Sequence, residues 1–367
     1  MKVALLGAGH IGQTIARLLT DCGDYTVTIA DQSAHALDGL HNLNAQRVLL
    51  QLGQADGIES VLRGHDAVIN ALPYPMAVQV AQAAKSTGCH YFDLTEDVAA
   101  TKAIAALADG APQAFMPQCG LAPGFIGIVA HHLAQGFDTL DEIKMRVGAL
   151  PAFPTNSLKY NLTWSVDGLI NEYCHPCEAI HQHQMTAMLP LEGLEHFSLD
   201  GVEYEAFNTS GGLGTLCETL KGKVRGLDYK SVRYPGHRDL MKFLLDDLQL
   251  SSHQGKLKTI LRDAVPTTMQ DVVLAFVTVS GQRQGVYVQD VFSRKIFAQR
   301  STATTQALSA IQITTTAGIC AVLDLFREGK LLPRQGFIRQ EQVPLPAFLS
   351  NRFGKAYDQA SRIESIS

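Results

Sequence analysis

The sequence has few charged residues and no long apolar run, and both shortages exclude classes of protein. Charged residues make up 18% of the 367 positions, and 30 Lys and Arg against 35 Asp and Glu give a formal net charge of -5. No concentrated basic patch is present, so we expect no nucleic-acid partner. No apolar run approaches the ~20 residues that a membrane-spanning helix needs, so we expect no membrane partner. The apolar stretch at the start is too short for a signal-peptide core, and we expect a cytoplasmic protein.

Cysteine is scattered rather than patterned, which argues against a disulfide framework. The seven cysteines are an odd number in a long chain, and we expect most of them to be buried small hydrophobes. The candidate zinc site is the pair Cys174 and Cys177, which is followed by His181 and His183. This stretch lacks the usual longer spacing to a second ligand pair, so we expect no metal site.

The first third of the chain alternates short β-rich runs with helical patterns. This order predicts parallel strands joined by right-handed crossovers, which is the doubly wound Rossmann arrangement of α/β proteins. Several of the runs are continuously apolar, as is typical of parallel strands buried on both faces. The expected strands are Val3 to Leu6, Thr26 to Ala30, Arg47 to Leu50, Ala67 to Ala71, Tyr91 to Leu94 and Ala114 to Met116.

The pattern changes after Pro123. A helical run from Phe125 to Ala134 precedes Glu142 to Val147, where polar and apolar residues alternate as in a strand with one solvated face. Asp271 to Val279 and Gly285 to Phe292 resemble the two strands of an antiparallel hairpin with a five-residue loop. We therefore expect a second domain of α+β type with an antiparallel sheet.

The residues from Thr302 to Phe326 contain no Pro and one Gly, and they predict a long helix. We expect this helix to pack back on the first domain. Length and composition together are consistent with two domains that each own a core, at about 100 to 200 residues per domain.

A glycine-rich loop follows the first expected strand and opens a helix, which is the context of a dinucleotide-binding fingerprint. Gly7 would permit the tight turn, Gly9 would let the backbone approach a pyrophosphate, and Gly12 would let the helix lie close to the strand. The helix N-terminus supplies free N–H groups and a partial positive charge for the phosphates. The loop reads Gly7, Ala8, Gly9, His10, Ile11 and Gly12.

Asp31 ends the next expected strand and favours NAD as the cofactor. Its carboxylate can accept hydrogen bonds from both ribose hydroxyls and would repel the 2′-phosphate of NADP. Gln32 and Ser33 follow it where an NADP site would favour Arg or Lys. The alternative is a Rossmann-like domain that has lost its cofactor.

Two further segments end strands at the carboxyl edge of the sheet, where ligands of open α/β folds gather. Ala71, Leu72 and Pro73 are expected to line the cofactor with their backbone. Asp93 is a candidate catalytic carboxylate, or equally a helix N-cap or turn residue.

The chain resembles the saccharopine dehydrogenase-like enzymes, and among them the shorter lysine 6-dehydrogenase branch. The resemblance rests on the glycine loop and on motifs of the second domain, which are specific as a set. The motifs are Tyr91 to Leu94, Gly120 to Gly124, Gly148 to Pro151, Tyr160 to Tyr173 and Tyr229 to His237.

The resemblance implies an N-terminal Rossmann domain, a second domain that forms a homodimer, and oxidation of a carbon–nitrogen bond in an amino acid or amine. On this basis we expect an NAD-binding domain over 1–122, a substrate and dimerisation domain over 123–300, and a C-terminal helix and tail over 301–367 that return to the first domain. One departure is mild: the cations Lys230 and Arg233 are kept, with Ser231 and Val232 between them in place of the family's Thr and Leu.

Amine oxidation needs a carboxylate clamp, an acid/base group and a dry pocket wall. Arg233 and Arg146 are the candidate clamps, with an ion pair as the alternative role. His237 and Lys230 are the candidate acid/base groups, and the alternatives are a capping histidine and a paired cation. The candidate wall residues, which could equally belong to a core, are Tyr160, Trp164 and Asp167.

The expected function is NAD-dependent oxidation at a carbon–nitrogen bond, with deamination of lysine as the leading guess. An imine reductase of the saccharopine or carboxynorspermidine type is one alternative. A non-catalytic NAD-binding sensor is the other.

Overall fold

The computed structural model describes residues 1–51, 56–300 and 307–358, and the chain divides into two compact units. The first unit combines Met1–Phe125 with Thr315–Lys355. The second comprises Ile126–Thr314 and the C-terminal end from Ala356. The expected limits of 1–122, 123–300 and 301–367 assign a function to each domain and stay a prediction. Residues 301–306 and 359–367 lie outside the described part.

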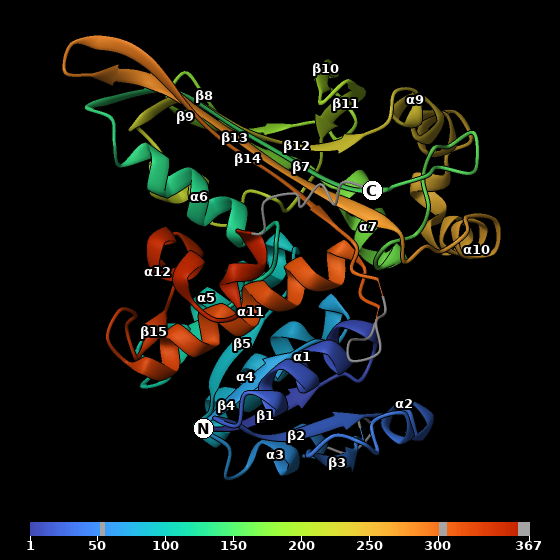
Figure 1. Ribbon diagram of the computed structural model, residues 1–367, viewed down its shortest axis with the longest axis vertical. Helices are drawn as coiled ribbons and strands as arrows, with labels where there is room; N and C mark the ends of the chain where they lie inside the picture. The colour runs from blue at the N-terminus through green and yellow to red at the C-terminus, as the bar shows by residue number, and fades with distance from the viewer. Residues whose placement is uncertain (52–55, 301–306, 359–367) are drawn as a thin grey trace, which may run out of the picture. The chain divides into compact units, whose positions relative to one another are not determined.

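The first unit is built on a parallel sheet of seven strands in the order β15-β6-β5-β4-β1-β2-β3. This arrangement confirms the expected α/β class with a doubly wound parallel sheet (Figure 1). All six expected strands form, and their ends differ from the prediction by one residue at most. Strands and helices in chain order are β1 (Lys2–Leu6), α1 (His10–Asp21), β2 (Thr26–Asp31), α2 (Ala34–Asp38), β3 (Gln46–Leu49), α3 (Gly57–Leu62), β4 (Ala67–Asn70), α4 (Ala77–Thr87), β5 (His90–Asp93), α5 (Val98–Ala108) and β6 (Ala114–Met116).

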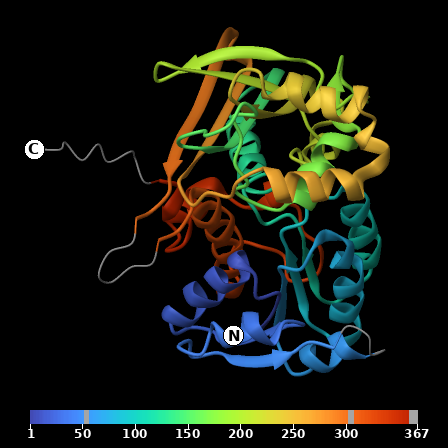
Figure 2. The ribbon, with the colours of Figure 1, turned by 90° about the vertical axis from the view of Figure 1, so that its right-hand side faces the viewer.

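The segment Thr315–Lys355 completes the first unit. β15 (Gly336–Phe337) pairs in parallel with β6 and forms the edge of the sheet, a strand that the sequence did not predict. The short helix α12 (Leu345–Ser350) follows it. Within this unit α11 (Ala310–Glu328) lies beside α1 (Figure 2), and its Asp324 accepts a 2.7 Å hydrogen bond from Tyr25.

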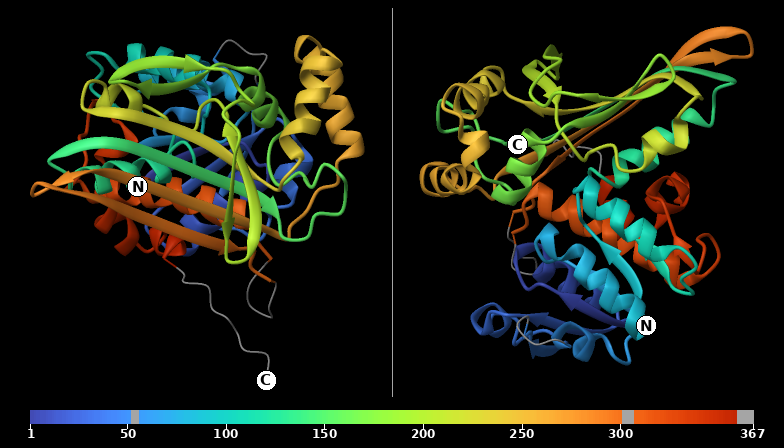
Figure 3. Two further views of the ribbon diagram at one scale, coloured as in Figure 1. Left: turned by 90° about the horizontal axis from the view of Figure 1, so that it is seen from above. Right: turned by 180° about the vertical axis from the view of Figure 1, so that it is seen from behind.

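The second unit carries a mixed sheet whose main path is β10-β11-β12-β7-β13-β14. Every described strand pair in it is antiparallel except β7 with β12, so the expected α+β domain is present with one parallel pair added. Figure 3 shows β7 between β12 and the β13–β14 hairpin. Its elements are α6 (Phe125–Ala134), β7 (Thr139–Pro151), α7 (Val166–Cys174), β8 (Cys177–His181), β9 (Gln184–Met188), β10 (Glu195–Leu199), β11 (Val202–Asn208), α8 (Leu216–Leu220), β12 (Val224–Arg233), α9 (His237–Lys242), α10 (Gln254–Ala264), β13 (Asp271–Arg283) and β14 (Val286–Phe297).

The expected five-residue loop of the hairpin is wrong. The strands pair without interruption until Arg283 meets Val286, which leaves a turn of two residues, Gln284 and Gly285, both with positive φ. Gly281, which suggested the loop, lies instead at a shift in register between β13 and β7. A Cβ at Gly281 would lie 2.1 Å from the carbonyl oxygen of Thr139. Glycine is therefore needed here because β13 and β7 approach closely, and not because the chain turns.

The expected start of the last helix, Thr302, lies outside the described residues, and the described residues 307–309 are not helical as predicted. Leu308 still pairs as an extended residue with Gln299, and α11 begins at Ala310. Ser309 accepts a hydrogen bond from the backbone N–H of Gln312, and the Gln312 side chain accepts one from the N–H of Ser309. This reciprocal capping box is the sequence signal that marks the true start.

Among the described helices, α11 alone is long and apolar enough to cross a membrane, with a mean hydropathy of 1.2. Of its most apolar window, 78% is buried inside the molecule. Length and composition are weak evidence for a span, because buried core helices have the same properties.

Candidate functional site

The glycine loop of the first unit has the geometry of a nucleotide cradle. Gly7 has a φ of +104°, and a Cβ there would lie 2.7 Å from the carbonyl oxygen of Ala71. A Cβ at Gly12 would lie 1.9 Å from the carbonyl oxygen of Gly7. Around Gly9, by contrast, a Cβ would meet nothing within 4 Å. Gly7 and Gly12 are therefore required by the fold, while Gly9 leaves open space where a phosphate could approach.

The helix that follows this loop begins without a side-chain cap. Gly9 is the N-cap of α1, and His10, Ile11 and Gly12 form its first turn. The first N–H groups of a helix have no partner within the helix, and together with the helix dipole they attract anions. The loop thus fits the pyrophosphate of a dinucleotide.

Asp31 lies beside the same loop. One of its carboxylate oxygens accepts a 2.7 Å hydrogen bond from the N–H of Ala8, and the other accepts a 2.8 Å bond from the N–H of Ser33. These two bonds fix the carboxylate at the end of β2, and each oxygen keeps a lone pair for a ribose hydroxyl. Leu72 and Pro73 follow Ala71 after β4, which pairs with β1 on the side away from β2, so the predicted cofactor residues of the first unit come together at one sheet edge.

Asp93 is buried at the carboxyl end of β5, with 1% of its surface exposed. It accepts hydrogen bonds from the Tyr91 hydroxyl at 2.6 Å, the Thr95 N–H at 3.0 Å and the Gln118 N–H at 2.8 Å. Burial raises the pKa of the Asp93 carboxyl to about 6, although these three bonds oppose the shift. The carboxylate therefore holds a turn together and also titrates near neutrality.

In the second unit, β12 presents two of the predicted site residues on opposite faces. Lys230 and Arg233 are three positions apart on a strand that pairs regularly with β7 and β11, and side chains alternate along a strand. Lys230 shares a face with its register partner Arg146, and Arg233 lies on the other. The two cations cannot serve one substrate group together.

The Lys230 face carries a cluster of paired ions. Arg146 binds both oxygens of Glu195 and one oxygen of Asp228, the latter at 2.5 Å. Lys230 donates to the Gly193 carbonyl at 2.6 Å and to Glu195 at 3.0 Å. Arg146 and Lys230 are therefore both paired with carboxylates of the same chain. This matches the alternative roles, an ion pair for Arg146 and a paired cation for Lys230.

Arg233 lies in a different environment, a cluster of aromatic side chains. The residue is 3% exposed, and its guanidinium carbon lies 5.2 Å from the ring centre of Tyr160 and 5.9 Å from that of Tyr173. Its Nε donates to the Tyr173 hydroxyl at 3.0 Å and its Nη1 to the Val232 carbonyl at 2.8 Å. No carboxylate within the described residues lies at ion-pairing distance. Burial alone would lower the pKa of Arg233, but the neighbouring phenols and the Glu172 carboxylate raise it, so the group stays charged.

His237 belongs to the same cluster and is fully buried. Its Nδ1 lies 3.0 Å from the Leu158 carbonyl and its Nε2 lies 3.1 Å from the Tyr173 hydroxyl. Burial, together with the Arg233 charge, lowers the pKa of His237 to about 3. The imidazole is therefore neutral at physiological pH, with both nitrogens engaged, and the predicted acid/base role has no support from this geometry.

The remaining predicted residues, Trp164 and Asp167, lie in different environments. Trp164 donates to the Tyr160 hydroxyl at 3.2 Å and joins the aromatic cluster. Asp167 instead forms ion pairs with Lys258 at 2.5 Å and Arg262 at 3.5 Å, both on α10. Its carboxylate links α7 to α10, and no contact connects it to Arg233 in the described chain.

The cysteines match the prediction that most are buried: all seven are free thiols, and five are buried. Cys174 ends α7 and Cys177 begins β8. Within the described residues, no group of three or more His, Cys, Asp and Glu side chains could hold a metal ion.

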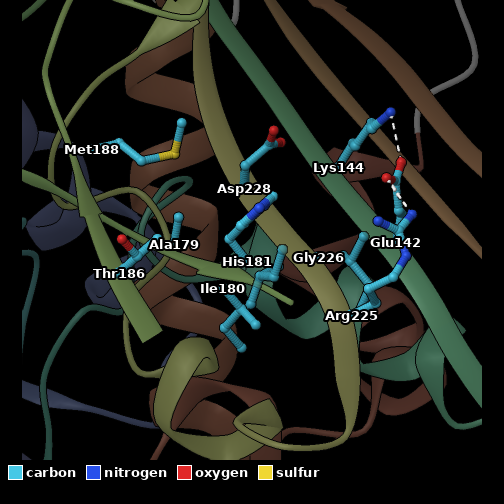
Figure 4. A pocket seen from close by; sticks show the side chains of 12 residues that line it. Glu142, Lys144, Ala179, Ile180, His181, Thr186, Met188, Arg225, Gly226 and Asp228 are labelled. Atoms are coloured by element: carbon cyan, nitrogen blue, oxygen red, sulfur yellow. Dashed lines mark hydrogen bonds and ion pairs between the residues drawn. The ribbon is translucent and has the colours of Figure 1, made fainter. Parts of the chain in front are cut away.

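A cavity of about 390 Å³ opens on the second unit between β7, β12 and the β8–β9 hairpin (Figure 4). Three of its ionic side chains are bound to one another, Lys144 to Glu142 at 2.8 Å and Arg225 to Glu142 at 2.7 Å, and a fourth, Asp228, is bound to Arg146. None of the predicted site residues lines it.

Sequence reasoning missed Tyr173, which contacts both Arg233 and His237, and Glu195, which pairs with Arg146 and Lys230. Tyr173 ends a motif on which the resemblance rests, but a buried hydroxyl cannot be distinguished from core packing by sequence spacing. Glu195 lies far along the chain from its partners and gives no local signal.

A parallel sheet with a glycine-lined, uncapped helix at its carboxyl edge defines a dinucleotide-binding domain. Two family models then match almost the whole chain: the saccharopine dehydrogenase NADP binding domain over residues 3–115 and the saccharopine dehydrogenase C-terminal domain over residues 120–350. The chain belongs to the saccharopine dehydrogenase family, as the motifs indicated, and is an oxidoreductase that binds NAD or NADP.

Two solved structures share the fold. Apo saccharopine dehydrogenase (L-Glu forming) from Saccharomyces cerevisiae is 15% identical, with a TM-score of 0.78 over 95% of this chain and 96% of that one. The homospermidine synthase of Legionella pneumophila in complex with NAD is 15% identical, with a TM-score of 0.69 over 97% and 89%.

Proposed function

We propose that this protein is an NAD-dependent oxidoreductase that acts on a carbon–nitrogen bond of an amino acid, with oxidative deamination of lysine at C6 as the leading candidate. The observation that carries the proposal is Arg233, a buried guanidinium that donates only to neutral groups in the described chain. A buried cation without an ion-paired anion suits a substrate carboxylate, which it can bind through two parallel hydrogen bonds.

The reaction balances as a hydride transfer followed by hydrolysis. A bound nicotinamide would accept the hydride from the carbon that bears the amine. An ammonium substrate, NAD⁺ and water give the aldehyde, ammonium, NADH and one proton. The chain must hold the carboxylate, exclude bulk water and remove a proton from the amine.

We infer that Asp93 is the base that accepts this proton. It ends β5 at the sheet edge that also carries the glycine loop, and its pKa of about 6 leaves it ionised but basic at pH 7. In Asp93→Asn we expect kcat to fall at least about a hundredfold and the acid limb of kcat/KM near pH 6 to disappear. Unchanged NADH binding is the control for folding. An acid limb that persists in the variant contradicts the assignment.

Asp31 supports NAD over NADP. Wild-type protein is expected to prefer NAD by roughly tenfold or more in kcat/KM, and Asp31→Ser should reduce that preference. Asp38→Ser, an exposed acid on α2, is the matched control. A clear NADP preference in wild type contradicts the Asp31 argument.

A substrate screen separates the candidate functions. NAD reduction is measured with lysine, saccharopine and related amines, and NADH oxidation with pairs of an amine and a carbonyl compound. Turnover with lysine supports deamination, and turnover only in the second assay supports an imine reductase of the saccharopine type. Tight NADH binding with no turnover supports the non-catalytic sensor.

We further propose that the protein is a cytoplasmic homodimer. β14 is an edge strand and exposes large apolar side chains, a feature of interaction surfaces. Their exposed fractions are 61% at Val286, 57% at Tyr287, 51% at Val291 and 50% at Phe297. Light scattering on the purified protein tests this, and a monomer mass at micromolar concentration contradicts it.

A further inference from the structure

Arg233, Tyr173 and His237 form one directed chain of hydrogen bonds within the second unit. The Leu158 carbonyl can only accept, so Nδ1 of His237 must carry the proton and Nε2 must be an acceptor. The Arg233 Nε can only donate, so the Tyr173 hydroxyl accepts from Arg233 and donates its own hydrogen to Nε2. The donor and the acceptor of each of these hydrogen bonds are therefore determined.

This chain of bonds also determines which edge of Arg233 is available. Nε donates to Tyr173 and one Nη1 hydrogen to Val232, so the edge formed by Nη1 and Nη2 has no acceptor among the described residues. Arg146 provides the contrast, because Glu195 and Asp228 already occupy its donors. The Tyr160 ring, 5.2 Å from the guanidinium carbon, limits its rotation from one side.

We propose that Tyr173 and His237 are positioning residues that hold Arg233 so that its Nη1–Nη2 edge receives the carboxylate of the substrate. His237 acts through Tyr173: as a neutral acceptor it orients the hydroxyl hydrogen away from Arg233 and leaves a lone pair for Nε. This inference rests on the proposed amino acid substrate and goes beyond it, because it requires a carboxylate and assigns a role to two residues that do not touch the substrate.

The kinetic test uses the full-length protein with its best amino acid substrate. Tyr173→Phe removes the hydroxyl and should raise the KM for the amino acid about 10- to 100-fold, with kcat and the KM for NAD changed less than about threefold. Tyr234→Phe is the matched control, because Tyr234 adjoins Arg233 but donates to the Pro151 carbonyl, and it should leave all three constants unchanged.

A pair of substitutions at His237 separates positioning from folding. In His237→Gln the amide oxygen can take the place of Nε2 as acceptor, so the amino acid KM should stay within about threefold of wild type. His237→Leu offers no acceptor and should match Tyr173→Phe. Thermal unfolding of both variants reports any loss of folding. Equal KM values in the two variants would overturn the proposal.

Trp164 provides a readout that does not depend on turnover. It is the single tryptophan of the sequence and is bonded to Tyr160, so its fluorescence reports on this cluster. Titration of the wild type with lysine should change the emission, and cadaverine, which lacks the carboxylate, should not. Tyr173→Phe should need at least about tenfold more lysine for the same change.

The outcomes are distinguishable. If the wild type turns over an amino acid but Tyr173→Phe behaves like Tyr234→Phe, the positioning role fails and the proposed function stands. If cadaverine is as good a substrate as lysine, the carboxylate site at Arg233 fails. If no amino acid or amine is turned over, the proposed function itself fails.

Discussion

His237 illustrates how burial removes a histidine from acid–base chemistry. The sequence alone made it a candidate proton carrier because the ordinary pKa of histidine is near neutrality. Inside the aromatic cluster its pKa is about 3 and both nitrogens are engaged. A rate profile between pH 6 and 9 should therefore not report this residue.

The same shift predicts how stability depends on pH. The pKa of His237 is lower in the folded than in the unfolded chain, so its stabilising contribution is complete above about pH 6.5 and is lost as pH falls toward 3, by up to about 1.4 kcal/mol per pH unit. Urea unfolding of wild type and His237→Gln should show a difference in the free energy of unfolding that shrinks between pH 7.5 and pH 5. A difference independent of pH would contradict the buried neutral state.

The three glycines of the loop should respond differently to one added methyl group. Gly12→Ala brings Cβ into the Gly7 carbonyl and should lower the free energy of unfolding by about 2 kcal/mol or more and abolish NADH binding. Gly9→Ala meets open space at an ordinary φ of -69° and should leave stability unchanged while weakening NADH binding at least about tenfold. Calorimetry gives both quantities. Equal effects of the two substitutions would argue against a phosphate at Gly9.

At the scale of elements, Gly281 and Gly285 of the β13–β14 hairpin provide a similar contrast. Gly281→Ala places a Cβ against the Thr139 carbonyl and should cost about 2 to 4 kcal/mol. Gly285→Ala should cost about 1 kcal/mol, the strain of its positive φ of +78°. Chemical denaturation measures both, and a larger cost at Gly285 would contradict the two-residue turn.

The elements that sequence predicted well are those with continuous apolar runs. Five of the six predicted strands of the first sheet needed no long-range information, because burial on both faces determines their composition. The exception is β3, in which Gln46, Arg47 and Leu49 are exposed. The two-residue β15 carries no periodicity, and its pairing partner lies more than 200 residues earlier. The hairpin turn was misplaced because a glycine at a register shift resembles a glycine in a turn.

The candidate site was predictable where its residues are close together in the sequence. The glycine loop and Asp31 belong to one βαβ unit and came together as expected. Lys230 and Arg233 were grouped because they are close in sequence, yet an odd spacing on a strand separates them. Tyr173 could be recognised only when α7 was placed against β12.

At the scale of the whole molecule, each ligand should leave its own pattern of protection. With saturating NADH, amide hydrogen exchange should slow within 1–125 and 315–355, and lysine alone should slow exchange around 158–173 and 229–237. Mass spectrometry of peptides measures both patterns. Protection by NADH confined to the second unit would contradict the assignment of the cofactor to the glycine loop.

The edge strand β15 has a consequence for synthesis of the chain. Residues 1–125 leave the ribosome without β15, the edge strand of their sheet, and without α11, whose Asp324 accepts a hydrogen bond from Tyr25. At typical translation rates the missing segment follows on the order of ten seconds later or more. During that interval we expect the unpaired edge of β6 to be open to pairing with other chains, which chaperones would prevent.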